Sequence, residues 1–332
     1  MQPAPTPPDS ADHGWQTVDW SSHAHDAEVN GRRVHYVDIG TGPPVVLIHG
    51  QGAAWQWWLR VIPVLAKDTR IIAIDLAGFG ESEPVASGDV FAEQVATVVG
   101  LLDHLRIAAA TLVGHSMGGL VAQRAACDHP DRVAGLLLID SGGNTVGQAR
   151  LTALQVGFRV FNLVFSIPAV PRSIARYGPL RIAFFALATA HPRCVTRQLA
   201  QELVPRMASP GFIATMVAGF QAVNQATPQA VPSPALVVWG RQDRIVPLSV
   251  GQRLAAEIPD ARLVVLDRVG HCAMIEQPIE TAALIASFSH DPVNGRPAGE
   301  PLQLDLDEQG RRVTNRFADR NGPSRLGRQN PA

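Results

Sequence analysis

The residues best suited to covalent chemistry lie in the segment Gly114-His115-Ser116-Met117-Gly118, which has the pattern Gly-x-Ser-x-Gly. The apolar run before it predicts a buried strand, and the pattern after it predicts a helix. A serine on a sharp turn between strand and helix projects its oxygen from the sheet, where the helix N-terminus favours developing negative charge. The flanking glycines leave room for this turn because they carry no Cβ. The segment therefore predicts that Ser116 is a nucleophile.

A serine nucleophile needs a base, and His271 is the candidate because an imidazole accepts protons near neutral pH. His271 follows a predicted strand and a glycine, so its loop can reach the serine. Asp243 follows another predicted strand and is the candidate acid, which would accept from the second ring nitrogen and fix the tautomer. Asp140 ends a third strand and is the alternative acid, although we interpret it as a structural turn residue.

Strands and helices alternate around these residues. Runs of Val, Ile and Leu, typical of strands buried on both faces of a parallel sheet, occupy residues 45–49, 70–75, 110–114, 135–140, 235–240 and 262–266. The sequence indicates helices at residues 90–105, 117–128, 249–257 and 277–288. Asn30-Gly31 between two alternating segments predicts a tight hairpin. This order predicts an α/β fold with a mostly parallel, doubly wound sheet of about eight strands and flanking helices.

The alternation stops between residues 144 and 230, where the sequence is helical, rich in Leu, Phe and Ala, and interrupted by prolines. We expect an inserted helical cap there, between core segments at residues 26–143 and 231–289. Residues 1–25 are rich in Pro, Ser and Asp and are expected to be disordered. Residues 290–332 are expected to form a flexible tail.

The cap differs from the rest of the chain in charge. Residues 145–230 contain eight Arg and one acidic residue, Glu202, so this segment carries +7 and the remainder −8, within a net charge of −1. One explanation is that basic cap helices pair with acidic groups of the core. The other is that the arginines attract an anionic substrate, an acidic carrier or an anionic lipid surface. The overall charge gives no sign of a nucleic-acid partner.

Two further features bear on location. The N-terminus lacks a basic start followed by an apolar stretch, so no secretory signal is expected, and no run reaches the ~18 apolar residues of a membrane span. The three cysteines are an odd number without metal-ligand spacing, which favours a reducing compartment. We expect a cytoplasmic protein without stable membrane insertion.

The chain resembles the α/β-hydrolase family, in particular capped serine esterases and lipases, over residues 28–288. Besides the Ser116 turn it carries, in the family's order, His49-Gly50-Gln51-Gly52, an Asp-x-x-Gly-x-Gly-x-Ser turn at residues 75–82, Trp239-Gly240 before Asp243, and Gly270-His271. The resemblance implies an oxyanion hole formed by the backbone amides of Gln51 and Met117. It also implies that the reaction needs no cofactor and no metal.

Other side chains near these motifs are candidates for binding the substrate. Trp55, Trp57 and Trp58 follow the predicted oxyanion loop, and we single out Trp55 and Trp58 together with His115. His49 is expected to order the loop rather than to transfer protons.

Together these features predict a serine hydrolase that cleaves an ester-like bond, a carboxylic ester or a thioester, of a small and largely apolar substrate. Ser116 would attack the carbonyl to form an acyl-enzyme, and water activated by His271 would release the acid. Carbon–carbon bond hydrolases and cofactor-free perhydrolases or haloperoxidases share this triad and are the alternatives. A ligand-binding receptor of the same fold is an alternative from a different class.

Overall fold

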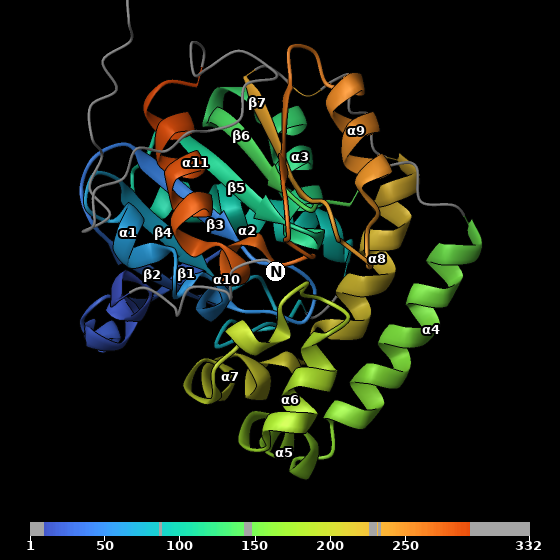
Figure 1. Cartoon of the computed structure of the whole chain (residues 1–332). Helices are drawn as coiled ribbons and strands as arrows, with labels where there is room; N and C mark the ends of the chain where they lie inside the picture. Colours follow the sequence, from blue (N-terminus) through green and yellow to red (C-terminus); the bar gives the residue numbers. More distant parts are fainter. Residues whose placement is uncertain (1–9, 86–87, 143–147, 226–230, 232–233, 293–332) are drawn as a thin grey trace, which may run out of the picture. The chain divides into compact units, whose positions relative to one another are not determined.

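The computed structural model describes residues 10–85, 88–142, 148–225, 231 and 234–292 (Figure 1). Its centre is one eight-stranded sheet in the order β1-β2-β4-β3-β5-β6-β7-β8. The pairs β1–β2 and β2–β4 are antiparallel and the other pairs are parallel. The predicted fold class is therefore confirmed. The strands are β1 (Ala24–Val29), β2 (Arg32–Ile39), β3 (Pro44–Ile48), β4 (Arg70–Ile74), β5 (Ala110–His115), β6 (Val133–Ile139), β7 (Ala235–Gly240) and β8 (Arg262–Leu266).

The apolar runs form strands at the predicted positions, with ends that differ by at most two residues. Strands β3 to β7 are almost entirely buried, as expected for strands covered on both faces, whereas most of β8 is only half-buried because it lies at the edge of the sheet. The predicted hairpin joins β1 and β2. Its turn residues Asn30 and Gly31 have φ values of 52° and 72°, the two positive angles that a tight type I′ turn requires.

Helices cover both faces of the sheet, and Figure 1 shows α3 and α11 on opposite sides of it. Apolar side chains of α2, α3 and α9 join one face of the sheet in a single hydrophobic cluster. On the other side, α11 packs against α1 and β6. These helices are α1 (Ile62–Leu65), α2 (Val90–His104), α3 (Met117–Asp128), α9 (Leu248–Glu257) and α11 (Pro278–His290), with the short α10 (Ala273–Glu276) before α11.

A helical insertion between β6 and β7 occupies the region of the predicted cap. It comprises α4 (Gln148–Phe165), α5 (Ala169–Arg176), α6 (Gly178–Phe185), α7 (Arg197–Leu203) and α8 (Phe212–Gln225). Helix α8 packs against α2, α3 and α4, so it anchors the cap to the core. In the described part of the chain no single helix is long and apolar enough to cross a membrane. Two consecutive helical segments, Thr152–Phe165 and Ala169–Arg176, are long and apolar enough only when taken together. The chain bends by 93° between them.

The N-terminal segment differs from the expectation of disorder over residues 1–25. Residues Ser10–Thr17 and Trp20–Ser22 form 3₁₀ helices, and β1 begins at Ala24. Trp15 is buried, the indole N–H of Trp20 donates to the Trp15 carbonyl at 2.8 Å, and the Trp20 ring lies 5.1 Å from the Trp55 ring. These tryptophans give a polar segment enough apolar surface to order it. Residues 1–9 and most of the expected tail, 293–332, lie outside the described residues.

Candidate active site

Ser116 lies on the turn between β5 and α3, as the motif predicts. Its backbone has φ 54° and ψ −119°, in the positive-φ region that non-glycine residues rarely adopt, and such a conformation costs of order 1–3 kcal/mol. The amide of Ser116 donates to the Ile139 carbonyl at 3.0 Å, which ties the turn to the neighbouring strand β6. Packing and this hydrogen bond therefore hold the serine in a strained position at the carboxyl end of the sheet.

The glycines around Ser116 are needed because other backbone approaches them closely. A Cβ on Gly114 would lie 2.5 Å from the carbonyl oxygen of Gly118, and a Cβ on Gly118 would collide with the carbonyl oxygen of His49. Neither position has room for a side chain, so the pattern Gly-x-Ser-x-Gly follows from the packing of the turn.

Asp243 and His271 form a buried, hydrogen-bonded pair. The distance between Asp243 Oδ2 and His271 Nδ1 is 2.7 Å, and the two residues are 8% and 5% exposed. The other carboxylate oxygen of Asp243 accepts the amides of Ile245 and Val246 at 2.7 and 2.9 Å. The carboxylate is thus fixed by three donors, and it orients the imidazole through Nδ1. The other ring nitrogen, Nε2, is left for a reacting group.

The environment of His271 favours its charged form. Burial alone would lower the pKa of His271, but the charge and hydrogen bond of Asp243, with a contribution from Asp140, raise the pKa above its ordinary value of 6.5. The imidazole is therefore a stronger base than a free histidine, and Asp243 is the main reason.

Asp140 lies near this pair but does not bond to it. One oxygen of Asp140 accepts the amide of Gly240 at 2.8 Å, while the fully buried Oδ2 has no hydrogen-bond partner. Burial and the charge of Asp243 raise the pKa of Asp140 well above its ordinary range, and His271 lowers it by less. Burial therefore favours the neutral form of the Asp140 carboxyl group, which lies at a turn with φ 45°. Of the two candidate acids, Asp243 is the one that contacts His271.

His115 joins the Ser116 turn to the His271 loop. Its Nε2 lies 2.7 Å from the His271 carbonyl oxygen, and the two imidazole rings are 4.9 Å apart. Burial lowers the pKa of His115 well below its ordinary value, so the ring is neutral and donates its proton to that carbonyl. No hydrogen bond joins Ser116 directly to the His271 ring in the described structure. The elements that carry the two residues are brought together through His115.

The predicted oxyanion loop lies against Ser116 and His115. A Cβ on Gly50 would be 3.0 Å from Ser116 Cβ and 2.9 Å from His115 Nδ1. The next residue, Gln51, is fixed by its side chain, whose Nε2 donates to the Phe212 carbonyl of α8 at 2.6 Å. Met117 is the first residue of α3, so its amide has no partner within the helix. Both amides proposed for the oxyanion hole therefore belong to segments next to Ser116.

His49 has both ring nitrogens committed to the backbone. Its Nδ1 lies 2.8 Å from the Gly50 carbonyl oxygen, and its Nε2 accepts the amide of Leu76 at 3.0 Å. Burial lowers the pKa of His49 to about 4, so the ring is neutral near pH 7. These contacts fit the expectation that His49 orders the loop.

The three tryptophans after the loop lie in different surroundings. Trp57 stacks on His115, with ring centroids 6.4 Å apart and an angle of 19° between the planes. Trp58 is completely buried in the core. Trp55 packs on Trp20 and lines a separate cleft of about 540 Å³ beside α7. Of the three indoles, Trp57 is the one that stacks on His115 beside Ser116, and the assignment of Trp55 and Trp58 to substrate binding stays a prediction.

Glu276 is a site residue that the sequence did not suggest. Its Oε1 accepts the amide of Gly270 at 2.6 Å, and its Oε2 accepts the amides of Ala190 and His191 in the cap at 2.7 and 2.9 Å. The amide of His271 also donates to a cap carbonyl, that of Ala188, at 2.7 Å. The loop that carries His271 is thus hydrogen-bonded to the cap in two ways, through the Glu276 side chain and through the His271 amide.

Comparison with known proteins agrees with this geometry. The family described as "alpha/beta hydrolase fold" matches residues 43–278. This chain belongs to the α/β-hydrolase family. It is 33% identical to 2-hydroxymuconate semialdehyde hydrolase from Pseudomonas sp. (strain CF600), over 78% of this chain and 90% of that protein. It is 36% identical to the dihydrolipoyllysine-residue acetyltransferase component of the acetoin cleaving system from Pseudomonas putida, over 75% of this chain and 65% of that protein.

Among solved structures, this hydrolase resembles a mutant of the meta-cleavage product hydrolase from Pseudomonas fluorescens IP01, complexed with acetates. The TM-score is 0.65 and the identity is 26%, over 80% of this chain and 97% of that one. The family and these hydrolase relatives establish that the protein is a hydrolase.

Proposed function

We propose that this hydrolase cleaves a carbon–carbon bond next to a carbonyl group, with Ser116, His271 and Asp243 as its catalytic triad. The observation that carries the proposal is the likeness to 2-hydroxymuconate semialdehyde hydrolase over most of both chains. A muconate semialdehyde contains no ester, so a hydrolase that acts on it must add water across a carbon–carbon bond. The likeness to a meta-cleavage product hydrolase structure supports the same class of reaction.

The residues of the site supply each step of such a reaction. Ser116 Oγ attacks the carbonyl while His271 Nε2 takes its proton, and the amides of Gln51 and Met117 hold the resulting oxyanion. When the oxyanion collapses, the carbon–carbon bond breaks and its electron pair leaves with the departing fragment, which takes from His271 the proton that came from Ser116. Water, deprotonated by His271, then releases the acid from the acyl-enzyme and regenerates Ser116.

This chemistry restricts the substrate. A carbon fragment departs only when its electron pair is stabilised, so the expected substrates are ketones or aldehydes conjugated to an enol or dienol. Catalytic hydrogen bonds are often long in a free enzyme and tighten when substrate binds, so the missing Ser116–His271 hydrogen bond is compatible with the proposal. His115 and Trp57, which adjoin Ser116, are the side chains we assign to the substrate side of the site.

Ester or thioester hydrolysis is the second candidate. It uses the same nucleophile, base and oxyanion hole, and differs only in the group that leaves. The 36% identity to an acetyltransferase component supports this candidate, because that protein's name describes transfer of an acyl group. A direct comparison of substrates is therefore the deciding measurement.

The test compares kcat/KM for a 2-hydroxy-6-oxo-dienoic acid, followed by loss of its dienol absorbance, with kcat/KM for p-nitrophenyl acetate. Carbon–carbon hydrolysis predicts that the dienol is preferred by at least ~100-fold, a transition-state difference of ~2.7 kcal/mol. Preference for the ester, with slow or no turnover of the dienol, would instead establish the ester reaction. Binding of either compound without steady-state turnover would contradict both reactions.

A further inference from the structure

The outer surface of the cap is unusually apolar. All the large hydrophobic side chains that are exposed in the described structure lie between Val156 and Leu187. Most of them form one row, which we call the α4 stripe: Val156, Val160, Leu163, Val164 and Ile167, 57%, 55%, 70%, 39% and 53% exposed. The spacing of three and four places the first four of these residues along one face of α4, and Ile167 follows the end of that helix. Tyr177, Leu180 and Leu187 extend the exposed apolar surface along the chain.

The opposite face of α4 holds the cap together. Phe158, Phe161 and Phe165 pack on one another or on Phe184 and Phe212, with ring centroids 4.0–6.3 Å apart. Helix α8 lies between α4 and the sheet (Figure 1). The stripe is therefore on the outside of the cap, and the interior of the cap is already filled by aromatic rings.

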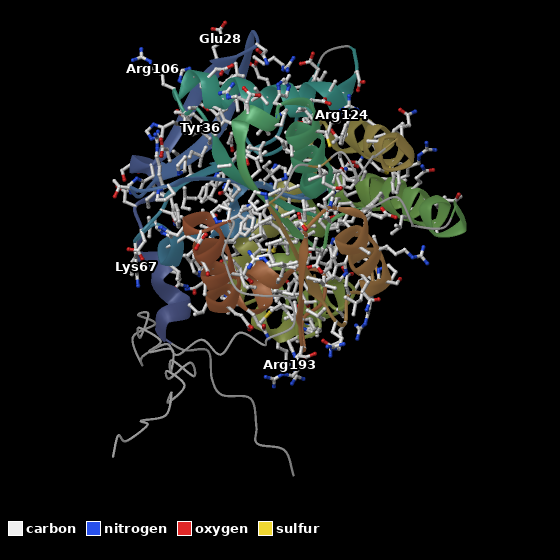
Figure 2. The ribbon with its side chains drawn as sticks, turned by 90° about the horizontal axis from the view of Figure 1, so that it is seen from above. Glu28, Tyr36, Lys67, Arg106, Arg124 and Arg193 are labelled. Carbon is white, nitrogen blue, oxygen red and sulfur yellow. The ribbon has the colours of Figure 1, made fainter. Side chains whose placement is uncertain are left out.

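Most arginines of the cap make no ion pair. Among the described residues, Arg206 pairs with Glu202 inside the cap, and Arg181 donates to the carbonyls of Val195 and Ala175. Five exposed cap arginines make no ion pair in the described structure: Arg159, Arg172, Arg176, Arg193 and Arg197. Figure 2 shows Arg193 pointing away from the ribbon. Pairing between cap and core therefore does not explain most of the positive charge of the cap.

Exposed apolar side chains and arginines without an ion pair occur in the same stretch of the cap, on α4 and on the helix that follows it. Arg159 lies on α4 about 60° around the helix from Val156, at the edge of the stripe. Helix α5, which starts two residues after Ile167, carries Arg172 and Arg176 four residues apart on one face. An apolar row bordered by arginines is typical of helices that lie in the interface of a membrane.

We propose that the α4 stripe and its neighbouring arginines dock this hydrolase on the surface of an anionic lipid bilayer. The apolar side chains would enter the boundary between headgroups and acyl chains, while the arginines contact lipid phosphates. A second copy of the chain fits less well, because a symmetric contact through this face would bring the same arginines towards one another. The inference holds whichever bond the active site cleaves.

The test measures binding of the full chain to vesicles of phosphatidylcholine alone and of phosphatidylcholine mixed with phosphatidylglycerol. We expect binding to the anionic vesicles, weakening as salt shortens the Debye length from ~30 Å at 0.01 M to ~8 Å at 0.15 M, and little binding to neutral vesicles. The double variant Arg172→Gln, Arg176→Gln should weaken binding by ~5-fold for each arginine removed. Arg253→Gln, an exposed arginine on α9 outside the cap, is the matched control and should bind as the unaltered protein does.

The apolar part is tested with Leu163→Asp. This side chain is 70% exposed, so its replacement should leave Tm and the turnover of a soluble substrate unchanged while vesicle binding falls at least ~10-fold. Absence of binding to anionic vesicles would overturn the proposal, and so would equal binding to neutral ones. Light scattering tests the alternative that this face joins two copies of the chain. A dimer that Leu163→Asp converts to monomers would show that it does, and would overturn the proposed contact with lipid.

Discussion

Glu276 accepts hydrogen bonds from Gly270 and from Ala190, at 2.6 and 2.7 Å, and so connects the loop of the proposed base to the cap. Replacing it by Gln puts an N–H₂ group where one carboxylate oxygen accepts, which leaves at least one of these partly buried amides unpaired, at a cost of up to ~1–3 kcal/mol. We expect a lower Tm and a kcat reduced ~10- to 100-fold with a smaller change in KM, because His271 is misplaced.

Glu28→Gln is the control for that experiment, since Glu28 lies on β1 and points away from the molecule (Figure 2). A variant at Glu276 that loses stability but keeps full kcat would show that the connection supports only the fold.

Ser116→Ala should remove the nucleophile and lower kcat/KM by at least ~10³-fold, because losses of a triad member are of this order or larger. A fluorophosphonate should label the unaltered protein once and the variant not at all. Ser249→Ala, an exposed serine on α9, should retain both labelling and activity. If Ser116→Ala kept more than about a hundredth of the activity of the unaltered protein, another residue would have to be the nucleophile.

The two aspartates near His271 should respond differently to amidation. Asp243→Asn places an N–H₂ group against His271 or selects the wrong tautomer, and should cost ~10⁴-fold in kcat. Asp140 does not hydrogen-bond to His271, and Asp140→Asn introduces an amide of the same shape, so a loss below ~10-fold is expected. The reverse ranking would identify Asp140 as the working acid.

The raised pKa of His271 sets the pH dependence. A base must be neutral to accept a proton, so kcat/KM should rise with pH through a midpoint above the ordinary value of 6.5. Asp243→Asn removes the negative charge that raises the pKa of His271, while burial still lowers that pKa. The midpoint of the residual activity should therefore move to lower pH. An unchanged midpoint would mean that another group titrates.

Much of the core could be predicted because its signals are local. A run such as residues 235–240 is short and apolar throughout, which is typical of a strand covered on both faces. The Ser116 turn is equally local, since Gly114, Ser116 and Gly118 are dictated by contacts within one strand–turn–helix unit and the adjoining loop. Asp243 and His271 were found because each follows a recognisable strand.

The remaining features depend on contacts between distant segments. Glu276 binds amides at residues 190, 191 and 270, and nothing in its own neighbourhood marks it as a link between cap and loop. The polar N-terminal segment is ordered by Trp20, whose indole packs on Trp55 and donates to the Trp15 carbonyl. The choice between Trp55, Trp57 and Trp58 depends on which indole the short helix turns towards His115, and three neighbouring tryptophans give the sequence no basis for that choice.

The backbone conformation of Ser116 serves the proposed catalysis and lowers the free energy of unfolding. Its φ of 54° is one that glycine adopts freely and serine does not. Ser116→Gly should therefore be inactive yet more resistant to unfolding than Ser116→Ala, by roughly 1 kcal/mol in denaturant titrations. Selection for stability alone would replace Ser116 by glycine, because glycine adopts this backbone conformation without strain. Glycine has no hydroxyl oxygen, so the same change would remove the proposed nucleophile.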